Sequence, residues 1–488
     1  MTCLVFSVWT HHALADPDPR YRPGDWRGYT TVRYVTSVAF TPDWLYFGTR
    51  GGIARYDRNL DRWVVPFTIS EGLPANAVVR LAYDPLTDEL YAETTRGYSR
   101  LSPIWHEWRD VSTFPDSLVQ GWQSVDLTRY QLPVGFDALD PGYLTDPHLR
   151  AYRIIGGEED SRGTLWLGTW GEFVWKLPWG VITVEPQSWG LFHDNVEAIF
   201  VDSSRVYFGG TNYYANEGAL SIYDTVASRW TYAEARFTSG FTSDHIHQFA
   251  GEPNGRFLWM ATDAGVVRLD RRTMQFRTFG QREGLTDERV WSLCVDGDIV
   301  WVGTETGVEG IYIPSDSVFF ATTAPVVNAR VAAIDVTGDV VWLGTDRGLF
   351  RLVKPVPEWQ FFSLPTGPLS GRVRAIRHDD HQVYVGTERG IVVIDRLGTH
   401  LPVGYDRSEG LPDDNVFDLA VTDSILWAAT RSGLVRFVPA TRERRVITAA
   451  DGLLDPLVQT IVVDGDYLWL GTEHGASRFR WNNPERID

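Results

Sequence analysis

The stretch Val341-Trp342-Leu343-Gly344-Thr345 decides the fold of this chain, because variants of it recur throughout the 488 residues. The unit is an aromatic residue between two apolar ones, then a small residue and Thr, and a Gly turn and a second short strand follow it. It occurs ten times, with the aromatic at Tyr46, Tyr91, Trp166, Tyr207, Trp259, Trp301, Trp342, Tyr384, Trp427 and Trp469. Successive aromatics are 45, 75, 41, 52, 42, 41, 42, 43 and 42 residues apart. This period is typical of one four-stranded blade of a β-propeller.

Each repeat divides into four strands, of which the aromatic unit is the second. Asp-Gly turns such as Asp296-Gly297-Asp298 are typical of tight hairpins between antiparallel strands. Because a blade buries both of its faces against its neighbours, we interpret the repeated aromatic residues as core rather than as a ligand site. Where the unit ends in a Gly-Thr pair, the Gly lets neighbouring backbones approach, and the Thr suits a strand end.

The predicted fold class is therefore all-β, a β-propeller of about ten four-stranded antiparallel blades over residues 31–488. We favour one ring of ten blades. Two rings of five would need a second closure that the sequence does not show, and seven plus three would leave three blades unable to close.

Closure is expected at the termini. The last repeat ends after its third strand, Gly475-Ala476-Ser477-Arg478-Phe479, whereas Asp25-Trp26-Arg27-Gly28-Tyr29-Thr30 has the pattern of a fourth strand. We expect residues 16–30 to supply the closing strand of the last blade, which would remove an exposed sheet edge.

The N-terminus and the composition indicate export and exclude one class of partner. Residues 1–15 end in Ala13-Leu14-Ala15 after an apolar stretch and resemble a truncated signal peptide. With no later run of 18 apolar residues, no transmembrane segment is expected in the mature chain, and the predicted location is periplasmic or extracellular. The 45 basic and 63 acidic residues give a net charge of −18, which argues against nucleic acid as a partner.

The repeats resemble a known family. Together with the aromatic unit, the turns Glu71-Gly72-Leu73-Pro74, Glu283-Gly284-Leu285-Thr286 and Glu409-Gly410-Leu411-Pro412 are similar to the two-component regulator propeller repeat. The resemblance implies an extracytoplasmic bacterial propeller that detects glycans, and it carries no catalytic residues to transfer. No kinase or DNA-binding module follows the repeats in this sequence. A signalling role would therefore need a separate membrane signalling or envelope protein as partner.

Two departures from the 42-residue period mark the expected binding site, because a rigid scaffold displays its variable loops on its faces. The 75-residue interval contains an insertion at about residues 112–148, and the 52-residue interval contains a longer loop at residues 209–218. The strand order places both on one face and on nearby blades. The candidate ligand-binding residues there are Trp122, Tyr130, Tyr143, Trp170, His193, Asn212, Tyr213 and Tyr214.

Aromatic rings interleaved with Asn, Asp and Glu suit carbohydrate, since sugar rings stack on them and hydroxyls bind the polar groups. Two alternatives stay open for this face. The insertion can fold over the surface and bury its own aromatics, or the face can dock a protein.

Metal binding and catalysis are weighed separately. His245 and His247 would lie on one side of a strand, but no third ligand is evident, so we assign no metal and no cofactor. Rim carboxylates are interpreted as solvated charges or turn caps, and no catalytic residue is assigned; they are Asp287, Glu288, Asp413 and Asp414. The predicted function is an exported, non-catalytic module that binds a glycan or protein ligand. The alternative is a propeller-type lyase or hydrolase acting on an extracellular polysaccharide.

Overall fold

The computed structural model describes residues 23–104, 107–120, 127–139, 142–181, 189–211, 218–252, 255–320, 328–354, 358–362, 371–396 and 402–483. In these ranges the fold is all-β, with short 3-10 helices in the connections. The strands form ten antiparallel sheets, which confirms the ten predicted blades; nine sheets have four strands and one has five. Among the described residues, no helix is both long enough and apolar enough to cross a membrane.

The blades are numbered in chain order, and neighbouring strands of each sheet are hydrogen-bonded. The first three blades contain β2 (Val35–Phe40), β3 (Trp44–Thr49), β4 (Gly52–Asp57) and β5 (Arg62–Phe67); β6 (Val78–Asp84), β7 (Glu89–Thr94), β8 (Gly97–Leu101) and β9 (Trp108–Val111); and β10 (Asp137–Leu139), β11 (Tyr143–Thr145), β12 (Ala151–Glu159), β13 (Thr164–Trp170) and β14 (Val174–Pro178). The fourth to sixth contain β15 (Asn195–Val201), β16 (Arg205–Thr211), β17 (Leu220–Asp224) and β18 (Arg229–Ala233); β19 (Ile246–Gly251), β20 (Phe257–Thr262), β21 (Gly265–Asp270) and β22 (Gln275–Phe279); and β23 (Val290–Asp296), β24 (Ile299–Thr304), β25 (Val308–Tyr312) and β26 (Ser317–Phe320).

The last four blades complete the chain. They contain β27 (Val331–Thr337), β28 (Val340–Thr345), β29 (Gly348–Val353) and β30 (Glu358–Phe362); β31 (Val373–His378), β32 (Gln382–Thr387), β33 (Gly390–Asp395) and β34 (Val403–Tyr405); β35 (Val416–Thr422), β36 (Ile425–Thr430), β37 (Gly433–Val438) and β38 (Glu443–Ile447); and β39 (Val458–Asp464), β40 (Tyr467–Thr472), β41 (Gly475–Arg480) and β1 (Trp26–Tyr29). The 3-10 helices are η1 (Pro23–Asp25), η2 (Ile69–Glu71), η3 (Asp116–Leu118), η4 (Leu127–Arg129), η5 (Ala235–Phe237), η6 (Gln281–Glu283), η7 (Ile313–Ser315), η9 (Arg407–Glu409) and η10 (Ala449–Asp451).

The repeated unit forms the second strand of each blade, and its side chains explain the repeat. Nine of the ten aromatic residues are buried core, as expected, and Trp342, Trp427 and Trp469 are at most 2% exposed. Tyr91 of the second blade is half-buried. The Thr that ends the unit closes the next turn, as where the Thr345 hydroxyl donates to the Gly348 carbonyl at 2.8 Å. Gly348 has a φ of 130°, a conformation that glycine adopts without strain.

The Glu-Gly-Leu turns are 3-10 turns with capped ends. In η2, the Glu71 carboxylate accepts from the backbone N–H of Thr68 at 2.8 Å, and Gly72 ends the turn at a φ of 97°. The same arrangement recurs at Glu283 and Gly284 in η6. Local hydrogen bonding therefore accounts for this part of the repeat.

The N-terminal strand completes the last blade, as predicted. β1 pairs antiparallel with β41, with Trp26 opposite Phe479 and Tyr29 opposite Ala476. The rings of Trp26 and Phe479 stack with centroids 4.3 Å apart. This pairing covers the edge of β41 that would otherwise be open.

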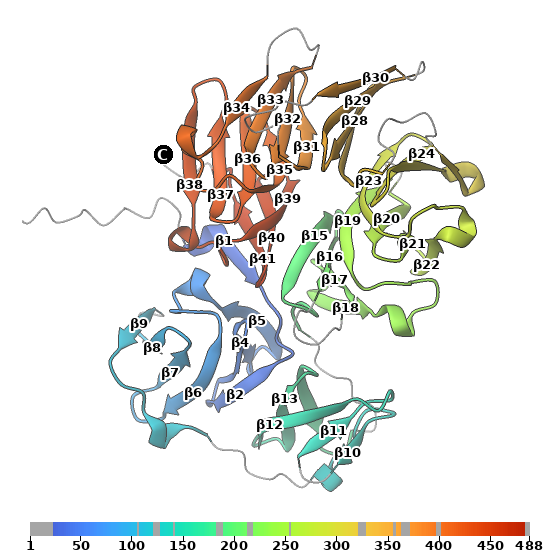
Figure 1. The fold of residues 1–488 in the computed structure, drawn as a ribbon. Coiled ribbons are helices and arrows are strands. Elements are labelled where there is room, and N and C mark those ends of the chain that lie inside the picture. The colour runs from blue at the N-terminus through green and yellow to red at the C-terminus, as the bar shows by residue number, and fades with distance from the viewer. Residues whose placement is uncertain are drawn as a thin grey trace, which may run out of the picture.

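The ten blades do not form one ring, so that part of the expectation is wrong. Strand β15 of the fourth blade packs against β39 of the tenth, which closes the fourth to tenth blades into a ring of seven. Figure 1 shows these blades, green to red, around one centre, with the three blue to teal blades below. The closing contact is tight: a Cβ on Gly471 would lie 3.0 Å from Cγ1 of Val196. We call these seven blades the ring.

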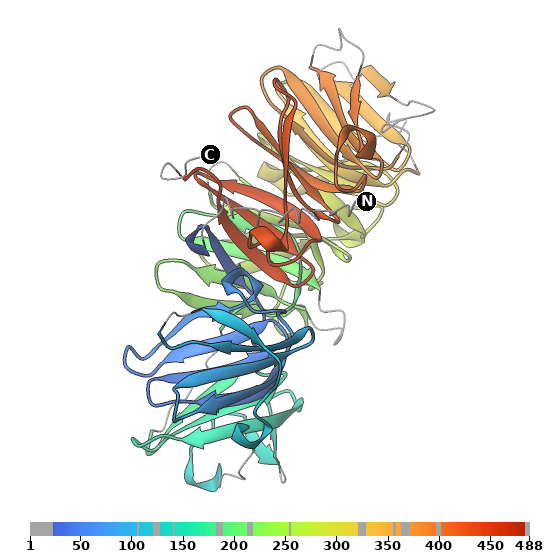
Figure 2. The ribbon, with the colours of Figure 1, turned by 90° about the vertical axis from the view of Figure 1, so that its left-hand side faces the viewer.

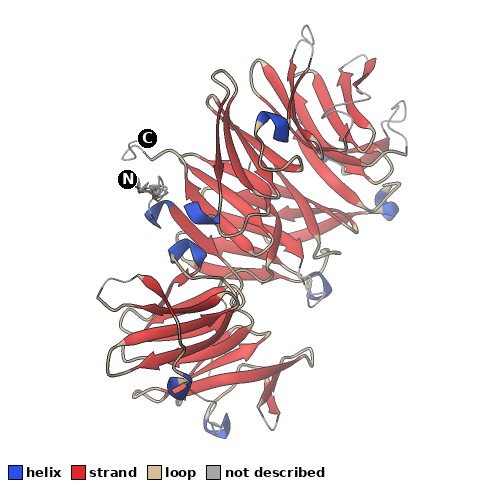
Figure 3. Ribbon diagram, turned by 60° about the vertical axis from the view of Figure 1, so that its left-hand side comes forward, coloured by secondary structure: helices blue, strands red, loops and turns tan. Residues whose placement is uncertain are grey.

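The first three blades form a separate open body, which we call the arc. β2 packs against β6 on one side and against β12 on the other, so the first blade lies in the middle. Figures 2 and 3 show the arc and the ring as two neighbouring bodies from other directions.

The arc is inserted into the chain at the point where the ring closes. The chain leaves the ring after β1 and returns to it before β15, and the two crossings are adjacent. Thr31 bridges to Gly190 and Leu191, and the Leu191 N–H donates to the Thr30 carbonyl at 3.0 Å. The ring is therefore a complete seven-bladed unit in space, and the arc is inserted into its sequence.

The insertion near residues 112–148 covers the outer face of the third blade. Its strands β10 and β11 extend that sheet to five strands. Tyr130 and Leu144 join a core cluster with Trp175, and Phe136 packs edge-on against Trp175 at a centroid distance of 4.7 Å. Tyr130 and Phe136 therefore follow the alternative in which the insertion folds over the surface and buries its own aromatic side chains.

Candidate functional site

A large cleft lies where the arc meets the ring. It has a volume of about 990 Å³ and is lined by strand β5 of the arc, strands β1 and β18 of the ring, and the connecting residue Trp189. This volume is at the upper end of the range typical of small-molecule sites. We call it the junction cleft.

Aromatic side chains form one wall of the junction cleft. The indoles of Trp63 and Trp189 stack, with centroids 6.1 Å apart and planes inclined by 13°. Tyr56 meets Trp63 edge-on at 5.3 Å, which braces the pair from the arc side. Trp63 and Trp189 are both partly exposed, so their surfaces contribute to the cleft.

Three arginines line the junction cleft. Arg62 and Arg229 are exposed and Arg27 is half-buried. None of the three forms an ion pair with a described carboxylate. The cleft's Asp61 is already engaged, by Lys176 at 2.5 Å and by the Tyr56 hydroxyl at 2.7 Å, and the Lys176 hydrogen bond lowers the pKa of its carboxyl. The cleft is therefore locally cationic in a chain of net charge −18.

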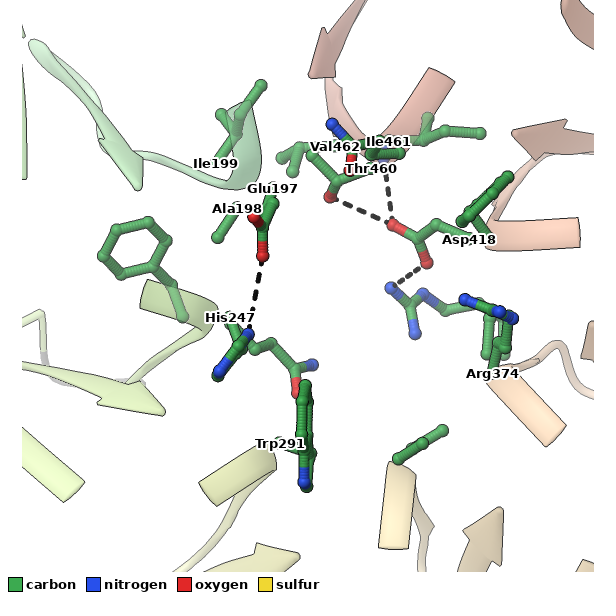
Figure 4. Close-up of a pocket in the computed structure, with 18 of the residues that line it drawn as sticks. Glu197, Ala198, Ile199, His247, Trp291, Arg374, Asp418, Thr460, Ile461 and Val462 are labelled. Carbon is green, nitrogen blue, oxygen red and sulfur yellow. Dashed lines mark hydrogen bonds and ion pairs between the residues drawn. The ribbon is translucent and has the colours of Figure 1, made fainter. Parts of the chain in front are cut away.

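A second site lies at the centre of the ring, where a cavity of about 170 Å³ opens (Figure 4). The inner strand of every ring blade carries a β-bulge near its start, after the second residue in β15 and after the first residue in the other six. The bulged residues all line the cavity, and they are Glu197, His247, Trp291, Ala332, Arg374, Phe417 and Gln459. Bulges often aim side chains at functional sites, and these seven residues differ from blade to blade.

One carboxylate of this cavity is structural. Asp418 accepts hydrogen bonds from Arg377 at 2.9 Å, from the Thr460 hydroxyl at 3.1 Å and from the Ile461 N–H at 2.9 Å. Its oxygens are occupied by neighbouring blades, so it joins blades rather than offering a free acid or base.

A histidine and carboxylate cluster lies at the edge of the cavity. His245 contacts Glu197 at 3.1 Å and Asp263 at 2.7 Å, and His247 contacts the same two carboxylates at 3.5 and 2.9 Å. Burial acts to raise the pKa of Glu197, but the hydrogen bonds and charges of both histidines outweigh it and lower that pKa. The hydrogen bond from His247 holds the pKa of Asp263 at about 2.

Among the residues that the structure describes, the predicted site residues do not come together as one site. Trp122, Asn212, Tyr213 and Tyr214 lie outside the described residues. Tyr130 is 6% exposed and His193 is fully buried, so neither reaches a surface ligand. The His193 ring bonds the Ala219 carbonyl at 3.0 Å, and burial lowers its pKa to about 4.

Two of the predicted residues remain exposed and share a face. Tyr143 is opposite Arg153, which is opposite Trp170 on the next strand, and the two aromatics are 42% and 36% exposed. Arg50 lies over the Trp170 ring at 5.1 Å. We call Tyr143, Arg153 and Trp170 the blade-three stripe, and it stays a predicted binding surface.

The rim carboxylates act as turn caps, as interpreted. Backbone N–H groups donate to Asp287 at 2.9 Å, Glu288 at 3.1 Å, Asp413 at 2.9 Å and Asp414 at 2.7 Å. These bonds satisfy turn donors and leave the four side chains a local structural role.

Sequence reasoning missed both the junction cleft and the third partner of the histidines. Trp63 follows Arg62 on an outer strand of the arc, as Trp230 follows Arg229 in the ring, and this shared Arg-Trp pattern was a usable signal. Glu197 is the bulged residue of its inner strand, as His247 is of the next one. Aligning inner strands by position would have paired them.

Comparison with known proteins locates the fold. A search of protein-family models found no match, and neither did a search of curated proteins. Among solved structures, the chain is similar to the extracellular domain of the hybrid two-component system BT3049 from B. thetaiotaomicron, with a TM-score of 0.52, 16% identity, and 93% and 68% of the two chains covered.

Two further structures agree. The extracellular domain of BT4673, from the same organism, matches with a TM-score of 0.50, 15% identity, and 93% and 71% coverage. PorZ, an essential surface component of the type-IX secretion system of Porphyromonas gingivalis, matches with a TM-score of 0.54, 15% identity, and 92% and 74% coverage. The chain therefore has the fold of the extracellular propeller domains of two-component systems, in agreement with the resemblance of its repeats to the two-component regulator propeller.

Proposed function

We propose that this chain is an exported, non-catalytic propeller module that binds an acidic glycan in the junction cleft. The carrying observation is the stacked pair of Trp63 and Trp189 beside arginines that have no described carboxylate partner. Sugar rings stack on indole faces, and guanidinium groups bind carboxylates in a bidentate manner. An acidic sugar offers both groups in one ligand.

Export and partnership rest on analogy of fold. The similar structures include extracellular domains of two-component systems and a bacterial surface component. A periplasmic or extracellular location, with a separate membrane signalling or envelope protein as partner, fits that architecture. A protein ligand remains the second candidate, because Trp and Arg also dominate protein interfaces.

A lyase or hydrolase activity is less well supported by the cleft. Canonical glycoside hydrolysis uses two carboxyl groups on either side of the scissile bond. Asp61 is the one carboxylate among the described cleft residues, and Lys176 and Tyr56 already hold it. The described lining is thus suited to holding a ligand and lacks an acid and base pair.

The test compares matched arginine variants in titration calorimetry with uronic-acid-containing and neutral oligosaccharides. Arg62→Ala and Arg229→Ala should each weaken binding of an acidic sugar at least tenfold, because hydrogen bonds to charged groups contribute about 1.5–3 kcal/mol. Arg431→Ala, an exposed arginine in a distant turn of the ring, is the control and should bind normally.

Other results of these experiments would favour a different binding surface, a protein ligand or a catalytic activity. Loss of binding in Tyr143→Ala and Trp170→Ala, with Arg62→Ala unaffected, would move the site to the blade-three stripe. Binding of a protein but of no sugar would replace the glycan by a protein ligand. Shortened or unsaturated sugar products after incubation would contradict the non-catalytic role.

A further inference from the structure

The cluster of Glu197, His245 and His247 has the geometry of a metal site. One ligand atom from each residue lies within 4.8 Å of the others. Glu197 Oε2 is 3.1 Å from His245 Nε2 and 3.5 Å from His247 Nδ1. Ligand atoms about 2.0–2.1 Å from a tetrahedral Zn²⁺ lie roughly 3.3 Å from one another. The observed separations bracket that value.

The ring nitrogens that face away from Glu197 are held by a single carboxylate. Asp263 Oδ2 accepts from His245 Nδ1 at 2.7 Å, and Asp263 Oδ1 accepts from His247 Nε2 at 2.9 Å. Metal-bound histidines typically donate their second N–H to a carboxylate, which fixes the tautomer and the orientation of the ring. Here one Asp does this for both imidazoles, so each remaining nitrogen faces Glu197 and offers its lone pair to a metal when it releases its proton.

Glu197 is positioned in the same way. Its Oε1 accepts from the Asn195 amide at 2.7 Å and from the Thr211 hydroxyl at 3.3 Å, and Oε2 is the oxygen nearer to His245, at 3.1 Å against 3.3 Å for Oε1. The Asn195 oxygen in turn accepts from Gln459 of the tenth blade. The ring of Trp291 lies 4.4 Å from the ring of His247 and closes one side of the cluster.

We propose that Glu197, His245 and His247 bind one divalent transition metal of the Zn²⁺ type, with Asp263 as the positioning residue of both histidines. Two imidazoles and one carboxylate favour Zn²⁺ and its neighbours over Ca²⁺ and Mg²⁺, which prefer oxygen ligands. Three protein ligands leave a fourth position for water or a ligand donor. Glu197 and His247 both line the ring cavity, so that position lies beside it.

The location gives the metal a structural consequence. Glu197 is on β15 of the fourth blade, whereas the histidines belong to the fifth blade. Through Asn195 and Gln459 the same network reaches the tenth blade, against which β15 closes the ring. Binding should therefore raise the thermal stability of the ring, because a ligand that binds the folded state stabilises it by mass action.

The test uses the full chain and the metal alone. Zn²⁺ added after chelation should bind at one ion per chain, as measured by elemental analysis after gel filtration, and should raise the melting temperature. Co²⁺ in its place should give the visible absorption of a tetrahedral site. Glu197→Gln and His245→Gln should each reduce the stoichiometry to near zero, and Asp263→Asn should weaken affinity about 10–100-fold.

The matched control is His474→Gln. His474 pairs with Asp455 at 2.7 Å, as His245 pairs with Asp263, but it belongs to no described three-ligand cluster. This variant should bind Zn²⁺ like the unmodified chain. The proposal is overturned if the unmodified chain binds no metal after chelation, if Co²⁺ shows no tetrahedral spectrum, or if His474→Gln loses as much metal as His245→Gln.

Discussion

The ring and the arc are built from the same repeat, yet one closes and the other stays open. Both use the same contact between blades, in which the Gly of one second strand meets an inner-strand Val of the next blade. Gly471 meets Val196 where the ring closes. Gly168 meets Val35 where the third blade packs on the first, and a Cβ on Gly168 would lie 2.7 Å from Cγ1 of Val35. A shared contact therefore does not specify how many blades meet.

The ends of the arc show what stops the series. In the second blade Glu93 stands where most other copies have Gly, and it forms an ion pair with Arg80 at 2.5 Å. Glu89 pairs with Arg100 on the same sheet at 2.8 Å. A charged sheet face does not accept a further blade, whereas the insertion covers the open face of the third blade. The arc thus ends in blade faces that are charged or covered, as the terminal repeats of other repeat proteins are, whereas every blade of the ring packs against two neighbours.

The largest expected effect comes from separating the two bodies. Joining Thr30 directly to Leu191 removes the arc without stretching the chain, because their backbone groups already lie 3.0 Å apart. The remaining ring should melt cooperatively near the temperature of the full chain. Residues 31–190 alone should melt broadly and at lower temperature, since the first blade loses its contacts with β1 and η10. Calorimetry of both pieces decides this, and a stable arc beside an unfolded ring would refute it.

A smaller effect is expected from substitutions at the fourth residue of the repeated unit. This residue lies at a contact between blades in the ring, but at the open end of the arc in the second blade. Gly386→Ala places a Cβ 2.8 Å from Cγ1 of Val416 and should destabilise the ring by about 1–3 kcal/mol. Glu93→Gly restores the repeat at the open end but removes only a partly exposed ion pair, so its cost should stay below about 1 kcal/mol. Urea denaturation measures both. Equal costs would mean that the small residue is not a blade contact.

A further effect, of a size similar to the Gly386→Ala cost but confined to the arc, concerns pH. Burial raises the pKa of Glu172 in the third blade to about 7, although Arg33 and Arg150 oppose the shift. A carboxyl group with a raised pKa contributes stability that is complete below pH 4.5 and is lost as pH rises through 7. Unfolding of the arc should therefore become easier between pH 5 and 8, by up to about 3 kcal/mol. Glu172→Gln should flatten this dependence, and an unchanged slope would contradict the assignment.

The candidate sites were less predictable than the blades. Tyr143 and Trp170 are brought together through Arg153 by strand register, which a sequence pattern can indicate. Tyr130 could not be placed, because an aromatic in a long loop suits a covered face as well as an exposed one. The partner of His245 is Glu197, which is 48 residues away and reaches it only because two blades pack side by side.

By itself, the sequence determined the blades, their turns and the strand that closes the last sheet, because these depend on local hydrogen bonds and on pairing within one sheet. The period, the Gly-Thr turns and the strand at Trp26 all carry that information. Only the tertiary structure decided which blade lies beside which. Blades meet through equivalent surfaces, so the sequence pattern does not distinguish Val35 from Val196 as the partner of a second-strand Gly. The shapes and charges of the other residues on the blade faces decide which blades meet.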